Sequence, residues 1–309
     1  MTDTLISADG LTLHYGRRIA VDNVSLAVAK GEVLGLLGPN GAGKSTTLQM
    51  LCGVLPPDRG HIEIAGFDLL RAPRQAKRQI GFLPEIPPVY GNATVTEYLT
   101  FCAGLRGLPR ARWREAVGAT SERCGLSAVG QRLIRNLSKG FQQRVGIAQA
   151  IIHEPAVVVL DEPTVGLDPG QVRAVRDLIA ELRSDHAIIL STHILGEVSA
   201  SCDRVTILCA GRIVYSGVLG AGGTRWSLRL GTAIDLAQLL KIHGIADASI
   251  LEPGHYAITL DSADTDTAAI ASSIISNGWR LLAWQPGDDA LEQLFLSATA
   301  DADAQERAA

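Results

Sequence analysis

One stretch of the chain, residues 38–45, carries the residue types that bind phosphate. It reads Gly-Pro-Asn-Gly-Ala-Gly-Lys-Ser and matches the phosphate-loop pattern G-x-x-x-x-G-K-[ST]. In such a loop, glycines let successive backbone N–H groups turn toward an anion, and the helix that follows adds its positive end. Lys44 would then reach the β- and γ-phosphates of a nucleotide, and the Ser45 hydroxyl would ligate Mg²⁺.

The residues on either side of this loop predict a strand before it and a helix after it. Residues 33–37 form a short apolar run bounded by glycines, which is typical of a buried parallel strand, and residues 46–51 read as a helix. The alternative is a glycine-rich turn that binds nothing. Strand, loop and helix in this order are the context that the phosphate-loop motif requires, so we favour a nucleotide site.

Two adjacent carboxylates follow a second apolar run at residues 157–160. Ligands of open α/β sheets bind at the carboxyl ends of the strands, where Asp161 and Glu162 are expected. Asp161 would hold Mg²⁺ directly or through water, as a Walker B aspartate does. Because side chains alternate along a strand, we expect Glu162 to point elsewhere and to activate the attacking water. The alternative is that the pair caps the next helix.

Two further residues have a structural and a functional interpretation. His193 ends a third apolar run, residues 187–192, and by itself a histidine there is more often structural than a sensor of the γ-phosphate. Tyr15 precedes the phosphate loop by about two dozen residues. By itself, packing in a strand is the better interpretation for Tyr15, and stacking on a flat base is the alternative.

Composition excludes several classes of protein. The 309 residues are 47% hydrophobic and 19% charged, which describes a globular chain rather than a disordered one. The five cysteines are scattered without Cys-x-x-Cys spacing, which predicts neither a zinc site nor a disulfide framework. The first 220 residues carry 23 basic and 20 acidic side chains, and the rest carry 5 and 12. Neither part is basic enough to indicate a nucleic-acid partner.

Hydropathy predicts that the chain does not cross a membrane. No stretch approaches the roughly 18 consecutive apolar residues of a spanning helix. The first ten residues have neither the positive region nor the apolar core of a signal peptide. We therefore expect a cytoplasmic protein, and any work at a membrane would need another polypeptide to span it.

A further motif, Leu-Ser-Lys-Gly-Phe-Gln-Gln-Arg at residues 137–144, makes the interpretation specific. Together with the phosphate loop and the Asp161–Glu162 pair, it resembles the signature motif of ABC-type ATPases. Residues 166–168, Gly-Leu-Asp, resemble the D-loop of that family, and His193 resembles its switch histidine. The order and spacing of these five motifs match the family over residues 1 to about 220.

The resemblance implies that two such domains pack head to tail and enclose two ATP molecules. Tyr15 matches the aromatic residue that stacks on adenine, and Asp168 would couple the two sites. The resemblance moves His193 to the sensor role, beside Glu162 as a catalytic residue. The implied ATP-binding residues are Tyr15, Gly38, Pro39, Asn40, Gly41, Ala42, Gly43, Lys44, Ser45 and Thr46. The implied signature residues, which would act in trans, are Ser138, Lys139, Gly140 and Phe141. Of these, Ser138 and Gly140 would bind the γ-phosphate of the partner's nucleotide.

Glu85 departs from the common family pattern, in which glutamine occupies this position. A carboxylate here can ligate Mg²⁺, but it adds negative charge near the γ-phosphate. Glutamate is familiar in the branch that resembles gliding-motility, multidrug and nitrous-oxide-maturation transporters. We assign Glu85 to the coupling loop and, together with Ser45 and Asp161, to the expected Mg²⁺ ligands.

The expected fold is an α/β phosphate-loop, RecA-like ATPase core with an antiparallel β subdomain and a helical subdomain. The ATPase domain is expected over residues 1–220, with the helical subdomain at about 86–150. A small α+β accessory or regulatory domain is expected over residues 225–298, ending in an amphipathic helix near 291–296. Residues 299–309 are small and charged, which predicts a disordered tail.

The leading functional hypothesis is the ATPase subunit of an ABC transporter, more in keeping with export than import. Its partners would be a separate multi-span membrane permease and a second ATPase domain, in a homodimer or heterodimer, with no nucleic acid. The chain would lie at the inner face of the cell membrane and dock through residues 85–95, including Tyr90. The alternatives are a soluble ABC-type ATPase acting on ribosomes or DNA, and a simple phosphate-loop kinase or NTPase.

Overall fold

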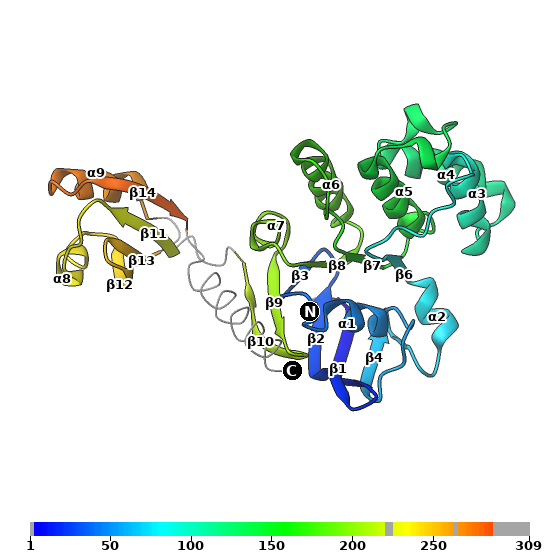
Figure 1. Cartoon of the computed structure of the whole chain (residues 1–309), viewed down its shortest axis with the longest axis horizontal. Helices are drawn as coiled ribbons and strands as arrows, with labels where there is room; N and C mark the ends of the chain where they lie inside the picture. The colour runs from blue at the N-terminus through cyan, green and yellow to red at the C-terminus, as the bar shows by residue number, and fades with distance from the viewer. Residues whose placement is uncertain (1–2, 220–224, 263–264, 287–309) are drawn as a thin grey trace. The chain divides into compact units, whose positions relative to one another are not determined.

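The computed structural model describes residues 3–219, 225–262 and 265–286, which divide into two compact units. The first unit is Met1–Gly217 and the second begins at Val218 (Figure 1). The helix expected near residues 291–296 and the tail 299–309 lie outside the described residues. Among the described helices, none has the length and apolarity that crossing a bilayer requires.

A six-stranded sheet forms the centre of the first unit, in the order β10-β9-β3-β8-β7-β6. The pairs β6–β7, β7–β8, β8–β3 and β3–β9 are all parallel, so the carboxyl ends of these strands lie at one edge of the sheet. The strands are β3 (Val33–Leu37), β6 (Ile80–Leu83), β7 (Val157–Asp161), β8 (Ala187–Thr192), β9 (Arg204–Cys209) and β10 (Arg212–Val218).

Both faces of this sheet are covered, which explains why its strands read as continuous apolar runs. Along β7, Val157 and Val159 pack into one hydrophobic core and Val158 and Leu160 into the other, because side chains alternate along a strand. Helices α5 (Lys139–Ile151) and α6 (Pro169–Leu182) cover one face (Figure 1). Helix α1 (Lys44–Leu51) and a second, antiparallel sheet cover the other.

The antiparallel sheet has the order β2-β1-β4-β5. Its strands are β1 (Thr4–Tyr15), β2 (Arg18–Ala29), β4 (Arg59–Ile64) and β5 (Phe67–Asp68). Strand β1 pairs with both β2 and β4. The β1–β2 hairpin turns between Tyr15 and Arg18, so the hairpin places these two residues together at its tip.

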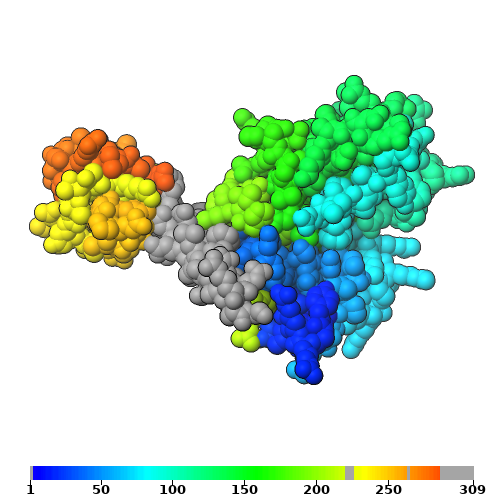
Figure 2. Space-filling model, in the orientation of Figure 1, coloured from blue at the N-terminus to red at the C-terminus, as the bar shows by residue number. Residues whose placement is uncertain are grey.

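The helical subdomain contains α3 (Val95–Leu105), α4 (Trp113–Arg123) and α5, and forms a lobe distinct from the antiparallel sheet (Figure 2). Thr94 begins α3 with a capping box, in which its hydroxyl accepts from the Glu97 amide and Glu97 accepts from the Thr94 amide. The remaining short helices of the first unit are α2 (Pro73–Arg78), η1 (Arg110–Arg112), η2 (Ser127–Val129), η3 (Ile134–Asn136) and α7 (Leu195–Ser201).

In its described residues, 225–262 and 265–286, the second unit has an antiparallel sheet, ordered β12-β13-β11-β14, and the helices α8 and α9. Its core is apolar and includes the fully buried ring of Tyr256. The elements are β11 (Arg225–Leu230), α8 (Leu236–Leu239), β12 (Ile245–Glu252), β13 (His255–Leu260), α9 (Thr267–Ser276) and β14 (Leu281–Pro286). Asp235 and Asp266 cap the two helices through their side chains.

Candidate nucleotide site

A cavity of about 700 Å³ surrounds the phosphate loop at the carboxyl edge of the core sheet. Most of the residues predicted to bind ATP line it, together with candidate catalytic residues that come from strands far apart in the sequence. The lining residues are Tyr15, Arg18, Ala20, Pro39, Asn40, Gly41, Ala42, Gly43, Lys44, Ser45, Thr46, Glu85, Glu162, Val165 and His193. Gly38, the first residue of the loop, does not line the cavity, and its carbonyl oxygen accepts a hydrogen bond from Lys44.

The phosphate loop connects the end of β3 to the first turn of α1, as the sequence predicted. Gly43 precedes the helix with φ of 100°, a backbone conformation that favours glycine. A Cβ atom at this position would lie 2.6 Å from the carbonyl oxygen of Ala20 on β2. Glycine is therefore required here both by the turn and by the close approach of the antiparallel sheet.

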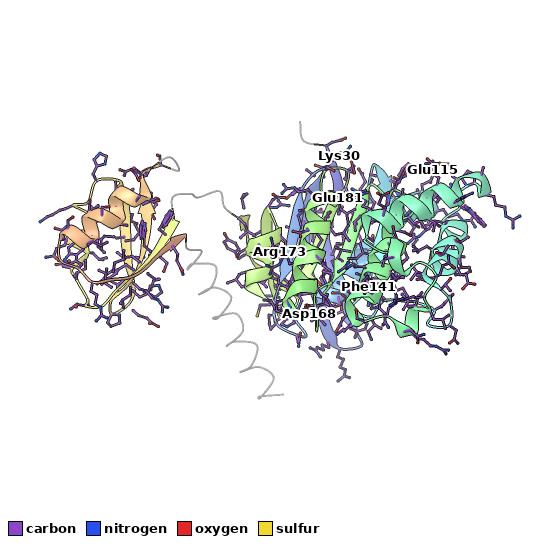
Figure 3. All side chains as sticks on the ribbon, turned by 90° about the horizontal axis from the view of Figure 1, so that it is seen from above. Lys30, Glu115, Phe141, Asp168, Arg173 and Glu181 are labelled. Carbon is purple, nitrogen blue, oxygen red and sulfur yellow. The ribbon has the colours of Figure 1, made fainter. Side chains whose placement is uncertain are left out.

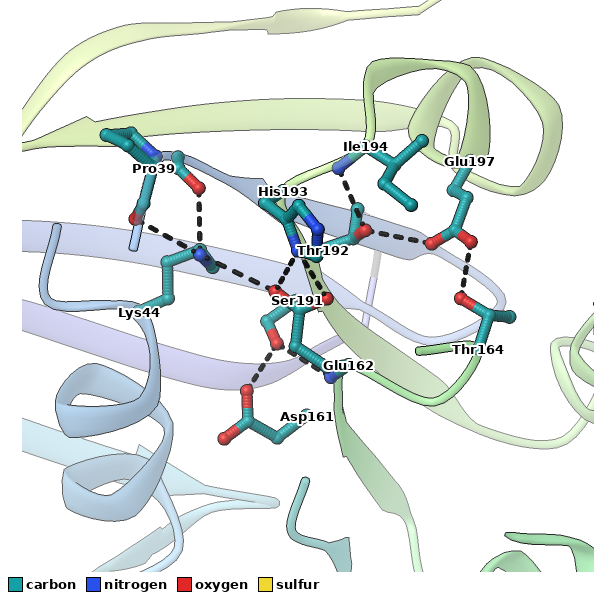
Figure 4. A network of polar contacts seen from close by, with 11 residues as sticks. Pro39, Lys44, Asp161, Glu162, Thr164, Ser191, Thr192, His193, Ile194 and Glu197 are labelled. Atoms are coloured by element: carbon teal, nitrogen blue, oxygen red, sulfur yellow. Dashed lines mark hydrogen bonds and ion pairs between the residues drawn. The ribbon is translucent and has the colours of Figure 1, made fainter. Parts of the chain in front are cut away.

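The ammonium group of Lys44 is buried in the loop (Figure 4). Its Nζ donates to the carbonyl oxygens of Gly38 at 2.8 Å and Pro39 at 3.3 Å, and lies 3.5 Å from Glu162 Oε1. Burial lowers the pKa of Lys44, and the negative charge of Glu162 opposes that effect. The loop thus positions one desolvated positive charge where the phosphates of a nucleotide would bind.

Glu162 follows the last residue of β7 and is held from the neighbouring strand. Its amide donates to the carbonyl and the hydroxyl of Ser191 on β8, at 3.2 and 3.0 Å. Its φ is 48°, in the left-handed region that glutamate rarely adopts. From the sequence, the alternation of side chains along a strand is expected to set the direction of the Glu162 side chain. Strand β7 ends at Asp161, however, so the positive-φ backbone of Glu162 beyond the strand sets that direction instead. Such strain at a site often accompanies function.

His193 lies beyond the end of β8 and faces Glu162. The imidazole Nδ1 is 3.0 Å from each carboxylate oxygen of Glu162. The Glu162 side chain is 8% exposed, whereas that of His193 is 40% exposed. Figure 4 shows Lys44 and His193 both directed at this carboxylate. The structure therefore brings together residues from three strand ends that are distant in sequence.

Asp161 is 3% exposed and accepts a hydrogen bond of 2.5 Å from the Ser191 hydroxyl. Oxygen ligands suit Mg²⁺, which proteins often bind through one or two carboxylates while substrate phosphates and waters complete the shell. No group of three or more His, Cys, Asp or Glu residues within the described ranges could hold a metal by itself. Asp161 therefore offers one carboxylate, and substrate phosphates and waters would have to supply other ligands of a Mg²⁺ ion here.

Three residues at the rim of the cavity come from other elements. Tyr15, at the end of β1, is 53% exposed, as a ring available for stacking would be. Arg18, the first residue of β2, was not identified from the sequence, although its position three residues after Tyr15 on the hairpin was a usable signal. Glu85 lies two residues beyond β6 and lines the same cavity.

The signature and D-loop residues do not line this cavity. Ser138 caps α5 by accepting from the Phe141 amide at 3.4 Å, and Asp168 caps α6 by accepting from the Gln171 amide at 3.0 Å. These two helix starts are neighbours, because a Cβ on Gly140 would meet the Gln171 side chain at 2.3 Å. Figure 3 labels Phe141 in the first turn of α5 and Asp168 at the start of α6.

Comparison with known proteins finds matches of this chain among ABC transporters. Residues 21–165 match the family model described as ABC transporter. The ABC transporter ATP-binding protein YxlF of Bacillus subtilis (strain 168), itself uncharacterized, is 40% identical over 70% of this chain and 71% of that protein. The linearmycin resistance ATP-binding protein LnrL of the same organism is 30% identical over 96% of this chain and 98% of its own length.

Solved structures agree with the sequence matches. The structure of CbiO1 from Clostridium perfringens, described as part of the ABC transporter complex CbiONQ, covers 70% of this chain and 89% of CbiO1. Its TM-score is 0.65 at 30% identity. Of these three relatives, LnrL is the one whose match extends over nearly the whole chain.

Proposed function

The chain belongs to the family of ABC transporter ATP-binding subunits, which are ATPases, and on this premise we propose how its site works. The proposal is that two ATPase domains enclose ATP and Mg²⁺, hydrolyse the ATP, and thereby move a separate permease that exports its substrate. The observation that carries it is the convergence of Lys44, Glu162 and His193 at one point beside the phosphate loop.

The substrate ATP would bind with its phosphates against the loop amides and Lys44, and with its adenine on Tyr15. Arg18, on the same hairpin, would add a positive charge at the rim of the cavity. Ser45, Asp161 and Glu85 would hold Mg²⁺, which when bound neutralises charge on the β- and γ-phosphate oxygens. Ser191 orients Asp161 through the hydrogen bond between them.

Glu162 is the general base of the proposed reaction. Its carboxylate would accept a proton from the water that attacks the γ-phosphate, while His193 contacts that phosphate and keeps the carboxylate oriented. Lys44 contacts the same carboxylate and would bind the phosphates as well. Nucleophile activation and charge stabilisation would therefore occur within one small region of the cavity.

The signature segment would complete the site of a partner subunit. Ser138 and Lys139 are exposed at the start of α5, where helix amides and the dipole favour an anion. They are absent from the lining of this chain's own cavity, which supports a role in trans. Asp168 is exposed beside this segment, in a position to contact the partner and couple the two sites.

ABC ATP-binding subunits work with a separate membrane permease, and the helical subdomain offers a surface for one. A groove of about 650 Å³ along α3 is lined by Phe101, Leu105 and Trp113 among others. The exposed ring of Tyr90 packs on Tyr98 and Phe101 at this edge. We propose that the permease docks here, so that the chain lies peripherally on the inner face of the cell membrane.

Export is the proposed direction of transport. One relative that matches nearly the whole chain is named for linearmycin resistance, and another is a bacitracin transport protein of Bacillus licheniformis. The second unit of this chain would serve dimer contact or regulation. Deletion of residues 225–309 is expected to change dimerisation or the ATPase rate, and a truncated chain with both unchanged would exclude that role.

A mixing experiment tests the shared site. Lys44→Ala and Ser138→Arg chains should each hydrolyse ATP poorly. In a head-to-tail dimer of one copy of each, one site carries both defects and the other carries none. Mixing should therefore restore hydrolysis. A mixture no faster than its separate components would contradict the proposal. The matched control mixes Lys44→Ala with Glu162→Gln, which leaves a defect in both sites and should remain inactive.

A further inference from the structure

Glu197 is a buried carboxylate beside the site, and the roles proposed above do not use it. It lies on α7 and is 5% exposed. Within the described part of the chain, its carboxylate accepts two hydrogen bonds, both from threonine hydroxyls, at 2.5 Å from Thr164 and 2.8 Å from Thr192. A buried carboxylate is costly unless it is well hydrogen-bonded, so this arrangement needs a reason.

The two threonines belong to the two segments that carry the candidate catalytic groups. Thr164 follows Glu162 by two residues and leads into the D-loop. Thr192 ends β8 directly before His193, and its hydroxyl also accepts from the Ile194 amide at 3.1 Å. Both threonines are buried, at 6% and 0% exposure. One carboxylate thus connects the segment after β7 with the segment after β8.

These contacts close a ring through the site (Figure 4). Glu197 accepts hydrogen bonds from Thr164 and Thr192. The segment that contains Thr164 also carries Glu162, and the segment that contains Thr192 also carries His193. These two segments make a second contact where His193 lies against Glu162. Hydrogen bonds to an ionised acceptor are stronger than neutral ones and restrict geometry more tightly. The distance between the Glu162 and His193 segments is therefore set at two points instead of one.

We propose that Glu197 is a positioning residue for ATP hydrolysis, holding the Glu162 and His193 segments in the geometry that the reaction needs. The proposal rests on the proposed roles of Glu162 and His193. A displacement of about 1 Å in a reacting group can lower a rate by about 10²-fold. Loss of either threonine hydroxyl should therefore slow the chemical step without removing any group that binds ATP.

The test compares valine and serine at each threonine in the full-length chain. Thr164→Val and Thr192→Val keep the side-chain shape and remove the hydroxyl, whereas Thr164→Ser and Thr192→Ser keep it. We expect each valine variant to lower kcat by about tenfold or more, with KM and the Kd for ATP within about twofold of wild type. The serine variants should stay close to wild type in all three constants.

Thr206→Val is the matched control. Thr206 is 1% exposed, lies on β9 and shares a hydrogen bond with Ser216. The Thr206→Val variant also loses a buried threonine hydroxyl, but at a position that does not line the cavity. Its kcat should therefore not change. A purely structural role for the Glu197 contacts would instead lower thermal stability alike in Thr206→Val and the site variants while leaving kcat intact.

The results separate this inference from the proposed function. Wild-type kcat in both valine variants, or an equal loss in the serine variants, would overturn it. Glu162→Gln is measured in parallel: if it is inactive while the valine variants are unaffected, only the role of Glu197 fails. If Glu162→Gln hydrolyses ATP normally, the general-base role proposed for Glu162 fails. Should a valine variant not fold, Glu197→Gln, which keeps size and polarity, is judged by the same split between kcat and KM.

Discussion

His193 Nδ1 lies 3.0 Å from both carboxylate oxygens of Glu162, so one imidazole nitrogen faces the whole carboxylate. Glu162 follows strand β7 and His193 follows the adjacent parallel strand β8. The Glu162 amide also donates hydrogen bonds to Ser191 on β8, two residues before His193. The Glu162 side chain is nearly buried and that of His193 is partly exposed. In the proposed reaction, the histidine would therefore contact a phosphate from the solvent side and orient the Glu162 carboxylate from the protein side.

Removing the Ser191 hydroxyl should weaken the proposed Mg²⁺ site. Ser191 donates to Asp161, and groups that orient a metal ligand are typically worth about 10–100-fold in metal affinity or activity. We expect Ser191→Ala to raise the half-saturating Mg²⁺ concentration, measured by Mg²⁺-dependent binding of ATP, by a factor in this range. Ser216→Ala, a serine on β10, is the control. An unchanged Mg²⁺ titration would remove Ser191 from this role.

Acid should destabilise the first unit through His153. Burial, with a smaller effect of Arg106, lowers the pKa of His153 to about 4. Between the ordinary value near 6.5 and about 4, the unfolded chain binds a proton that the folded chain does not, so stability falls as pH falls through this window. Below about 4 both states bind it and the loss is complete. His153 should contribute up to about 3 kcal/mol of this loss.

Urea unfolding of the wild type and of His153→Gln between pH 7 and pH 4 measures this contribution. Glutamine keeps an N–H donor for the Ile80 carbonyl, which His153 Nε2 contacts at 3.2 Å. The variant should lose less stability on acidification than the wild type. Identical pH profiles for the two proteins would show that His153 does not carry the effect.

A charge in the α3 groove should uncouple the permease. Leu105 is 70% exposed and lines the groove, so Leu105→Glu changes its surface without disturbing a core. We expect loss of co-purification with the permease, while the ATPase rate of the isolated subunit stays within about twofold of wild type. Val54→Glu, at a residue that is 58% exposed elsewhere on this unit, should co-purify normally. Co-purification of Leu105→Glu at wild-type levels would exclude this groove as the docking site.

The sequence was sufficient to predict the strand ends that build the site. Apolar runs before the phosphate loop, before Asp161 and before His193 are all buried strands of one sheet, because a parallel sheet covered on both faces admits few polar residues. The family fold was predicted correctly from the same motifs. Such local patterns report directly on burial and on backbone conformation.

Other features depended on contacts that no local pattern shows. Glu162 has a positive φ, and its amide donates a hydrogen bond to Ser191, which is 29 residues away in sequence. The hydrogen bond from Thr164 to Glu197 spans 33 residues. Arg18 lines the cavity because a hairpin tip folds over the phosphate loop. Each of these features follows from the sheet order, which the sequence does not state.

The ATPase rate of Glu162→Gln, measured together with its affinity for ATP, tests the account most directly. Glutamine keeps the size of the side chain but cannot accept the proton of the attacking water. Turnover should fall by about 10²–10⁴-fold while ATP still binds. Glu181→Gln, a carboxylate on the exposed side of α6, should hydrolyse ATP at the wild-type rate. Wild-type turnover in Glu162→Gln would contradict the central claim that this residue activates the water.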